Sequence, residues 1–170
     1  MDKPKVIVIC GPTASGKTSL GIKLANRING EIISCDSMQI YIDMDIGTAK
    51  PTLEERKAAK HYLVDFVSPD RRYSVADYKK DAEETIEKII SEGKTPIIVG
   101  GTGLYLNSLV YGIEYPNIET DLKYREELEN RVLAEGLGKL YDEAAEIDPE
   151  AIKKISPNDK KRILRILEIY

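Results

Sequence analysis

Short, uninterrupted apolar runs recur along the first part of the chain, and segments with a helical pattern separate them. The runs are residues 5–10, 31–35 and 96–99, and residues 62–67 form a further possible strand. Continuous runs of this length are typical of strands that are covered on both faces of a parallel sheet. We therefore expect a parallel sheet with the strand at residues 5–10 in its centre.

The segment after the first run has the periodicity of an amphipathic helix. Leu20, Leu24 and Ile28 recur every four residues within residues 17–29, and Gly30 follows as a helix terminator. Because a second strand begins directly afterwards, the order strand, helix, strand predicts a βαβ unit with a right-handed crossover.

A longer helix is predicted over residues 75–92. Ser74 precedes it, Asp77 occupies the position that completes a capping box, and Gly93 follows as its end. One stripe of this helix is apolar, as expected for a helix that packs on a sheet. The stripe consists of Tyr78, Ala82, Ile86, Ile89 and Ile90. Shorter helices are expected over residues 53–60 and 104–111.

The composition changes after Pro116, where charged sequence with a helical pattern replaces strand-forming sequence. We therefore expect two parts, an α/β core at residues 1–115 and a helical subdomain at residues 116–170. The helices predicted in the second part cover residues 126–135 and 139–147.

Two more helices are indicated near the end of the chain. Asp148 and Pro149 are typical of the N-cap and first position of a short helix, and Asn158 of the start of a last one. The last helix is still periodic at Tyr170 and no Gly, Asn or Pro ends it, so we expect it to be incomplete.

The size and composition are those of a globular protein. The 170 residues are 42% hydrophobic with a formal net charge of −4, which suits one core and excludes a disordered tail. The apolar runs are too short for a signal peptide or a membrane span, so we expect a cytoplasmic monomer without membrane contact. Cys10 and Cys35 are too few for a disulfide framework and have no ligand cluster for zinc, so both are expected to be buried packing residues.

The acidic average conceals two segments of opposite charge. Residues 114–150 carry twelve acids and four bases, whereas residues 153–165 have a net charge of +5. A local basic helix attracts a phosphate backbone even when the whole chain is acidic. A solvated helix face is the alternative interpretation of the same charges.

A glycine-rich segment lies between the first predicted strand and the first predicted helix. It matches the pattern G-x-x-x-x-G-K-[ST] in the context in which that pattern binds phosphate. Backbone N–H groups and the helix N-terminus face one anion, Lys17 adds a positive charge, and the Thr18 hydroxyl can hold Mg²⁺. The predicted diphosphate-binding residues are Gly11, Pro12, Thr13, Ala14, Ser15, Gly16, Lys17 and Thr18. The fold class is therefore predicted to be α/β, a P-loop NTPase-like parallel sheet flanked by helices, with a helical insertion.

Asp36 follows the second strand, at the sheet edge that also carries the P-loop. Its carboxylate has three possible roles: a ligand of Mg²⁺, a general base, or a cap for the turn before Met38. Spacing alone does not choose among them. Asp65 is a second, weaker candidate for a metal-binding acid.

The strand at residues 96–99 ends in Gly100, Gly101 and Thr102 instead of an acid, so a complete hydrolytic ATPase site is not evident. Adjacent glycines suit a close approach of the backbone to a ligand, and Thr102 offers a hydroxyl; an ordinary helix start is the alternative. His61 is the only histidine, and we expect a structural role for it.

Several segments together closely resemble the tRNA dimethylallyltransferase family, also called tRNA isopentenyltransferases. The resemblance covers essentially the whole chain, in order and in spacing. The segments are residues 11–18, 36–41 (DSMQIY), 45–51 (DIGTAKP), 73–77 (YSVAD), 100–105 (GGTGLY) and 158–168 (NDKKRILRILE).

This resemblance implies a reaction and a set of partners. The P-loop would hold dimethylallyl diphosphate with Mg²⁺, and the N6 amine of the adenosine 3′ to the anticodon of a tRNA would attack its allylic carbon. Asp36 would be the base, with Lys17 and Thr102 as further catalytic residues. The implied tRNA-binding residues are Asp36, Ser37, Met38, Gln39, Thr102, Arg125, Lys161, Arg162, Ile163, Leu164 and Arg165. The helical part after Pro116 would then contact the anticodon arm.

Three other functions compete with this one. A small-molecule kinase would use ATP at the P-loop with Asp36 or Asp65 near the metal, and a nucleotide-binding switch would need effector loops. An adenylate isopentenyltransferase would modify a free nucleotide, against which the basic helix argues. Members of the family continue beyond the position of Tyr170, so we also expect this chain to bind diphosphate without turning it over.

Overall fold

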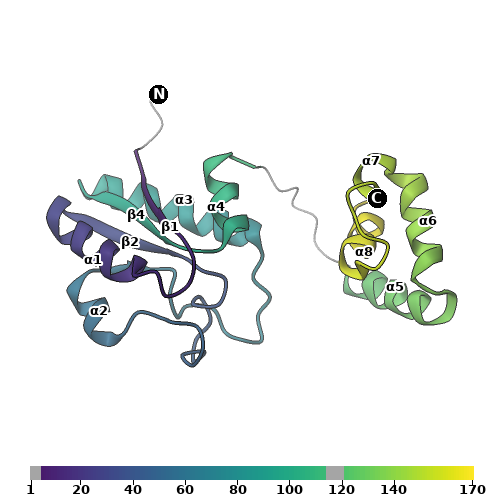
Figure 1. Cartoon of the computed structure of the whole chain (residues 1–170), viewed down its shortest axis with the longest axis horizontal. Coiled ribbons are helices and arrows are strands. Elements are labelled where there is room, and N and C mark those ends of the chain that lie inside the picture. The colour runs from purple at the N-terminus through teal and green to yellow at the C-terminus, as the bar shows by residue number, and fades with distance from the viewer. Residues whose placement is uncertain (1–4, 114–120) are drawn as a thin grey trace. The chain divides into compact units, whose positions relative to one another are not determined.

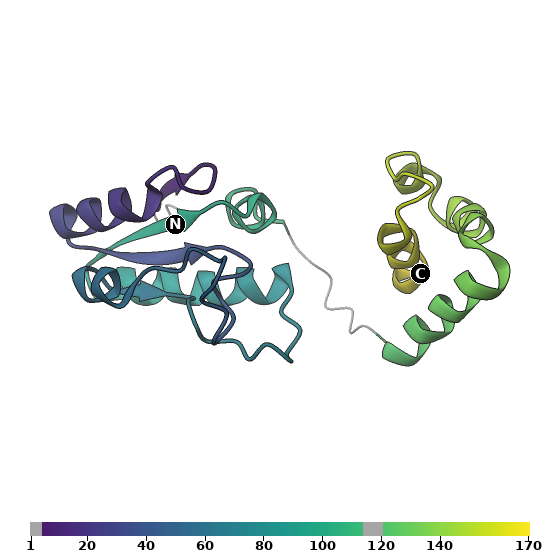
Figure 2. The same cartoon turned by 60° about the horizontal axis from the view of Figure 1, so that its bottom comes forward.

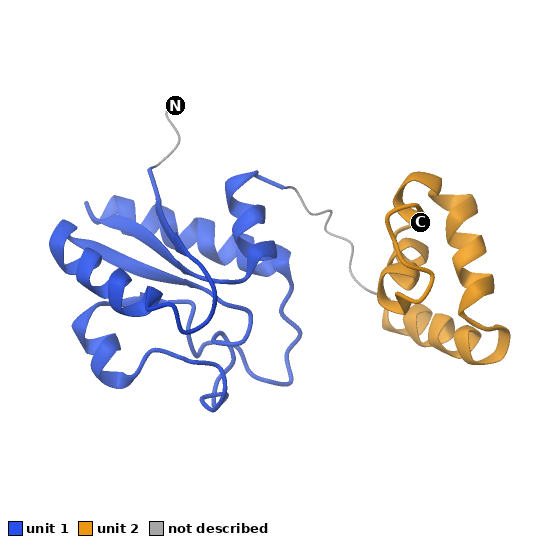
Figure 3. Ribbon diagram, in the orientation of Figure 1, with its two compact units in different colours: residues 1–115 blue, residues 116–170 orange. Residues whose placement is uncertain are grey.

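The computed structural model describes residues 5–113 and 121–170, and it divides into two compact units, Met1–Tyr115 and Pro116–Tyr170. Figure 3 shows the two units in different colours. The boundary predicted between residues 115 and 116 lies outside the described residues. Each unit has an apolar core of its own, so the units are described one at a time.

Unit 1 is built on a parallel sheet, as the apolar runs predicted (Figure 1). Among the described residues the sheet has four strands in the order β1-β4-β2-β3. The strands are β1 (Ile7–Cys10), β2 (Gly30–Cys35), β3 (His61–Tyr62) and β4 (Thr95–Gly100). The helices of unit 1 are α1 (Lys17–Ile28), α2 (Leu53–Ala58), α3 (Val75–Ser91) and α4 (Gly103–Val110).

Helices cover both faces of the sheet of unit 1 (Figure 2). The core of the unit is divided between these faces because side chains alternate along each strand. On one face Ile32 and Ile97 pack with Ala25 of α1. On the other face Ile33 and Ile98 pack with α3 and α4. Neighbouring strand residues point to opposite faces, so one buried run supplies both layers. The predicted α/β class with helices around a parallel sheet is confirmed.

The strand at residues 5–10 was expected in the centre of the sheet, and this expectation is wrong for the described residues. Among residues 5–113 and 121–170, β1 pairs only with β4 and lies at the edge of the sheet. Ile7 and Val8 are 36% and 37% exposed, and Cys10 is exposed as well. An apolar run shows that a strand favours burial, but long-range pairing decides which strands cover it.

The strand predicted over residues 62–67 is mostly absent. Within residues 61–67, only His61–Tyr62 pairs with β2. Farther along this segment, Val67 forms an isolated bridge with Tyr41. Leu63 and Asp65 have φ values of 57° and 55°, in the left-handed region that interrupts a strand.

The helix ends confirm some local signals and correct others. The capping box of Ser74 and Asp77 is present at the start of α3. α1 ends at Asn29, whose φ is 53°, and the predicted terminator Gly30 instead begins β2. In the predicted apolar stripe of α3, Ile90 is exposed while the other four residues are buried.

Unit 2 consists of helices in its described part. They are α5 (Leu122–Glu135), α6 (Leu137–Ile147), α7 (Pro149–Ile152) and α8 (Lys160–Ile169). Leu128, Leu140, Ile163 and Leu167 belong to its core. Asp148 caps α7 with Pro149 at its first position, as predicted, whereas the cap of α8 is Asp159 instead of Asn158.

Within the described residues, each helix is too short or too polar to cross a membrane.

Gly30 is required by close packing, and this generates a prediction about stability. A Cβ atom at Gly30 would lie 2.7 Å from Cδ1 of Ile97 and 2.9 Å from the backbone oxygen of Thr95. We expect Gly30→Ala to lower the free energy of unfolding by about 1–3 kcal/mol, because the backbone of β4 must move. Urea unfolding followed by circular dichroism measures this change.

Gly138 provides the matched control, since a Cβ there meets no atom within 4 Å. Gly138→Ala in α6 should leave stability unchanged or raise it by up to about 1 kcal/mol, because Ala favours helix. Equal unfolding midpoints for the two variants would contradict the packing explanation.

Candidate functional site

The candidate site lies where three parallel strands end together. Cys10 of β1, Gly100 of β4 and Cys35 of β2 occupy one row of the sheet. The P-loop, the segment that begins at Asp36 and the turn at Gly101 and Thr102 therefore start side by side. Carboxyl ends of parallel strands are where α/β proteins bind ligands.

The P-loop connects β1 to α1 and leaves the first turn of that helix open. Gly16 is the N-cap with a φ of 80°, no side chain caps the helix, and its first turn carries no acid. In contrast, α2 and α3 both begin with capping boxes. The uncapped N–H groups of α1 therefore suit an anion. Lys17 Nζ donates to the backbone oxygen of Pro12, so the ammonium group lies over the loop.

One cavity of about 480 Å³ brings together nine of the thirteen site residues that were predicted in unit 1. Its predicted members are Thr13, Ala14, Ser15, Gly16, Lys17, Thr18, Asp36, Met38 and Gln39. Six residues that were not predicted for the site complete the lining, Ser19, Gly47, Thr48, Ala49, Glu55 and Val99, together with Gly100, for which a close approach to a ligand was one of two expectations. Residues 47–49 belong to the GTAKP segment, which was singled out for the family resemblance. The spacing of residues in the sequence did not indicate that this segment lies beside the P-loop.

One oxygen of Asp36 caps a turn. Its Oδ1 accepts hydrogen bonds from the N–H groups of Met38 at 2.9 Å and Gln39 at 3.3 Å. Its Oδ2 has no hydrogen-bond partner among the described residues. The capping role is thus observed, and it holds the carboxylate in one orientation with the second oxygen left for a ligand.

Thr102 holds the turn that carries Asp36. Its Oγ1 accepts a hydrogen bond from the N–H of Ser37 at 3.0 Å, and its own N–H donates to the Cys35 oxygen at 3.1 Å. Gly100 lines the cavity of about 480 Å³, and close packing gives a second reason for a glycine at this position. A Cβ at Gly100 would lie 2.1 Å from the Cys35 oxygen, so the glycine permits two strand ends to touch.

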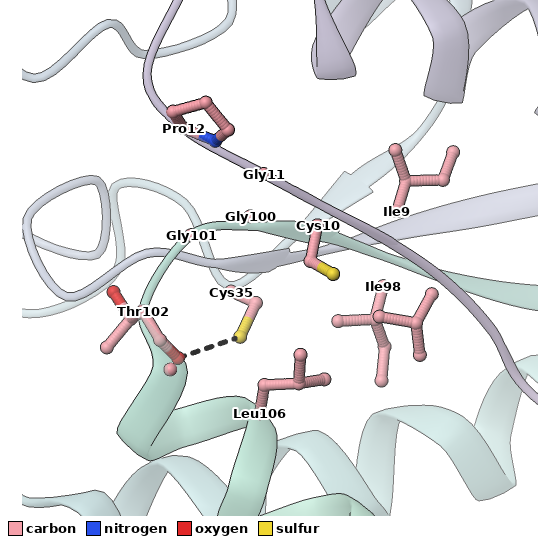
Figure 4. Close-up of a pocket in the computed structure, with 12 residues that line it drawn as sticks. Ile9, Cys10, Gly11, Pro12, Cys35, Ile98, Gly100, Gly101, Thr102 and Leu106 are labelled. Carbon is pink, nitrogen blue, oxygen red and sulfur yellow. Dashed lines mark hydrogen bonds between the residues drawn. The ribbon is translucent and has the colours of Figure 1, made fainter. Parts of the chain in front are cut away.

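A second cavity of about 320 Å³ lies beside the P-loop and contains Gly11, Pro12 and Thr102 (Figure 4). Figure 4 shows the Cys35 sulfur directed at the Thr102 oxygen, at 3.8 Å. Burial raises the pKa of Cys35 to about 11, so its thiol stays protonated and acts as a packing group, as predicted. Cys10 also lines this cavity, but it is exposed, so the prediction that it is buried is wrong; among the described residues β1 is an edge strand.

The weaker candidates are engaged elsewhere. Both carboxylate oxygens of Asp65 bind cations, Lys50 and Arg56, and are not open to a metal. His61 Nδ1 lies 2.8 Å from the Ala59 oxygen, and burial lowers the pKa of its ring, which fits a structural role. The described residues contain no group of three or more His, Cys, Asp or Glu side chains that could hold a metal ion.

Unit 2 corrects two of the predicted tRNA contacts. Ile163 and Leu164 are 0% exposed and belong to the core, so their side chains cannot reach a nucleic acid. α8 is amphipathic, and a continuous segment such as residues 161–165 necessarily includes its inner face.

The cationic residues predicted to contact tRNA in unit 2 are mostly paired with acids. Arg125 and Arg165 both contact Glu168, at 2.6 Å and 3.1 Å, and Arg162 lies 3.4 Å from Asp159. Lys161 has no ion pair among the described residues. Pairing within the unit therefore reduces the basic character that the sequence suggested.

Comparisons with known proteins identify a family to which the chain is similar. A family model described as IPP transferase matches residues 39–170. The tRNA dimethylallyltransferase of Acetivibrio thermocellus is 53% identical over 97% of this chain and 53% of its own length. That of a Thermoanaerobacter strain is 50% identical over 98% of this chain and 53% of its own length.

Solved structures that resemble this chain also include enzymes of this kind. The tRNA isopentenylpyrophosphate transferase of Bacillus halodurans has a TM-score of 0.66 and 46% identity, over 98% of this chain and 55% of its own. A eukaryotic dimethylallyltransferase acting on tRNA has a TM-score of 0.82 and 36% identity, over 99% of this chain and 42% of its own. The chain spans about half the length of the curated relatives it matches. The family model and these identities show that the chain belongs to the IPP transferase family.

Proposed function

We propose that this chain forms part of an enzyme that transfers a dimethylallyl group from dimethylallyl diphosphate to the N6 amine of the adenosine 3′ to the anticodon in tRNA. The observation that carries this proposal is one cavity lined by Lys17, Thr18 and Asp36. It sets an anion-binding loop against an oriented carboxylate. The names of the relatives support the choice of tRNA and of a prenyl donor.

The P-loop side of the cavity suits the leaving group. In the transfer, the bond between the allylic carbon and the diphosphate oxygen breaks while a carbon–nitrogen bond forms, and the electron pair leaves with the diphosphate. The open N–H groups of α1 and the Lys17 ammonium would stabilise the charge that grows on that oxygen.

The donor set fits Mg²⁺ as well. This ion commonly keeps several waters and takes one or two protein oxygens together with phosphate oxygens. The Thr18 hydroxyl lies in the same cavity as the P-loop and would be its protein ligand. When bound, Mg²⁺ would neutralise charge on the diphosphate.

The Asp36 side of the cavity suits the nucleophile. An adenine amine is a weak nucleophile because its lone pair is delocalised, and it loses a proton as the new bond forms. With Oδ1 held by two N–H groups, Oδ2 of Asp36 would accept that proton. The target base must leave its stack to reach such a site, and Met38 and Gln39 would line the space for it. The hydrogen bond from the N–H of Ser37 to Thr102 would hold the turn that carries Asp36 and Met38.

Loss of Asp36 as a base should slow transfer without removing the donor. We expect Asp36→Asn to lower the rate by about 10²–10⁴-fold with little change in binding of dimethylallyl diphosphate, because the P-loop is intact. Lys17→Met should weaken that binding instead. Transfer of radiolabel to unmodified tRNA measures the rate, and calorimetry measures binding.

The assay includes this chain and a version extended to the length of the relatives. Labelled tRNA from wild type, lost in Asp36→Asn, is the expected result. ATP-dependent phosphorylation of a small molecule, with no label on tRNA, would refute the proposal in favour of a kinase.

Unit 2 would bind the anticodon arm through its exposed cations. Arg125, Arg162 and Arg165 contact acids. Among the cations predicted to contact tRNA, Lys161 is therefore the one best able to contact a phosphate. We expect Lys161→Ala to weaken tRNA binding and to reduce the slope of log affinity against log salt by roughly 0.7–0.9.

Lys139→Ala is the control for Lys161→Ala, since Lys139 pairs with Glu135 on the acidic helices. Its tRNA affinity should match that of wild type. Equal affinities and equal salt slopes for all three proteins, measured by filter binding, would exclude Lys161 from the interface.

A further inference from the structure

A lysine with a buried side chain, Lys50, directly follows the turn at residues 47–49, which lines the same cavity as Asp36. The Lys50 side chain is only 4% exposed. Its ammonium donates to the Tyr41 oxygen at 2.7 Å, to Asp45 Oδ1 at 2.9 Å and to Asp65 Oδ1. Burial by itself lowers the pKa of Lys50, but the hydrogen bonds to Asp65 and Asp45 outweigh it and raise the pKa above its usual range. The charge is therefore retained and paired with two carboxylates of the chain itself.

Asp65 links Lys50 to α2 and to Gln39. Its second oxygen pairs with Arg56, whose Nε donates to the Pro51 oxygen at 3.1 Å. The N–H of Asp65 donates to the Gln39 oxygen at 3.0 Å. Asp65 thus connects Lys50 to the residue that hydrogen-bonds Asp36.

Gln39 closes a ring of contacts within residues 36–50, here called the Asp36 loop. Its side-chain amide donates to the oxygens of Thr48 at 3.2 Å and Ala49 at 3.0 Å. Its backbone N–H donates to Asp36 Oδ1. A displacement of the turn next to Lys50 would therefore reach the Asp36 carboxylate through Gln39.

The Asp36 loop does not hold its shape through local preference. Asp43 and Ala49 have φ values of 61° and 50°, a region that residues with a Cβ seldom adopt. Gly47 has a φ of 79° in the same turn. Such conformations persist only where surrounding contacts hold them in place.

We propose that Lys50 is a positioning residue for the transfer reaction: it ties the Asp36 loop to Asp65, so that the Asp36 carboxylate stays directed at the P-loop cavity. This inference rests on the proposed function for its effect on rate. The tether itself does not depend on which reaction the site performs.

The test compares Lys50→Met with wild type, in this chain and in the version extended to the length of the relatives. Removal of the ammonium should speed hydrogen–deuterium exchange of amides in the Asp36 loop, with no change in the P-loop or α3. The kcat for prenyl transfer should fall by about ten- to a hundredfold, because the carboxylate is misplaced. The KM for dimethylallyl diphosphate should stay within about twofold, since the P-loop supplies its contacts. Lys50→Arg, which keeps the charge, should restore part of the kcat.

Lys57→Met is the matched control, because Lys57 is an exposed lysine of α2 nearby in the chain. It should leave exchange and kcat at wild-type values. If Lys50→Met unfolds unit 1, the isosteric variant Asp65→Asn is tested in its place. It should give the same faster exchange in the Asp36 loop and the same loss of kcat.

The outcomes separate the two proposals. Unchanged exchange in the Asp36 loop, or an equal kcat for Lys50→Met and wild type, would overturn the role of Lys50. If wild type makes no prenylated tRNA in either version, the proposed function fails. Exchange, measured with and without magnesium diphosphate, still decides whether Lys50 tethers the Asp36 loop.

Discussion

The candidate site depends on how closely three strand ends approach one another. β4 lies between β1 and β2, and at their carboxyl ends Gly100 touches the backbone of Cys35 so tightly that a side chain at that position has no room. This contact and the pairing of β1 with β4 place the P-loop, the Asp36 loop and the Thr102 turn at the carboxyl ends of the strands. A phosphate-binding loop and a carboxylate from distant parts of the sequence thereby share one cavity.

The two walls of that cavity are held by different means. On the P-loop side, α1 begins without a capping side chain, so its N–H groups are left for an anion. On the other side, side-chain hydrogen bonds hold the chain in place: Thr102 holds Ser37, Gln39 holds the turn at residues 47–49, and Lys50 holds Asp65. Open N–H donors and a hydrogen-bonded carboxylate in one cavity suit the transfer that we propose.

Charge in unit 2 is governed by pairing more than by composition. The segment at residues 153–165 is basic in sequence, yet Lys160 pairs with Glu129, and Glu168 contacts both Arg125 and Arg165. Each such pair reduces the field that a nucleic acid would meet, and exposed pairs contribute little to stability. The guanidinium groups of Arg125 and Arg165 are oriented by a nearly buried acid, which limits how they can meet a phosphate.

The sequence by itself determined the features that depend on neighbours in the chain. These are the P-loop between strand and helix, the capping box at Ser74, the proline-started helix after Asp148 and the parallel α/β class. Each arises from hydrogen bonds or periodicity within a few residues, so local pattern suffices to predict it.

Only the tertiary structure decided the features that depend on distant partners. It placed β1 at the edge, gave Leu63 and Asp65 left-handed backbones, buried Ile163 and Leu164, and showed that Gly30 and Gly100 are packing residues. It also connected Lys50 with Asp36, through contacts that no sequence spacing indicates. The physical reason is that strand order, burial and close approach are set by long-range contacts, which a one-dimensional pattern does not contain.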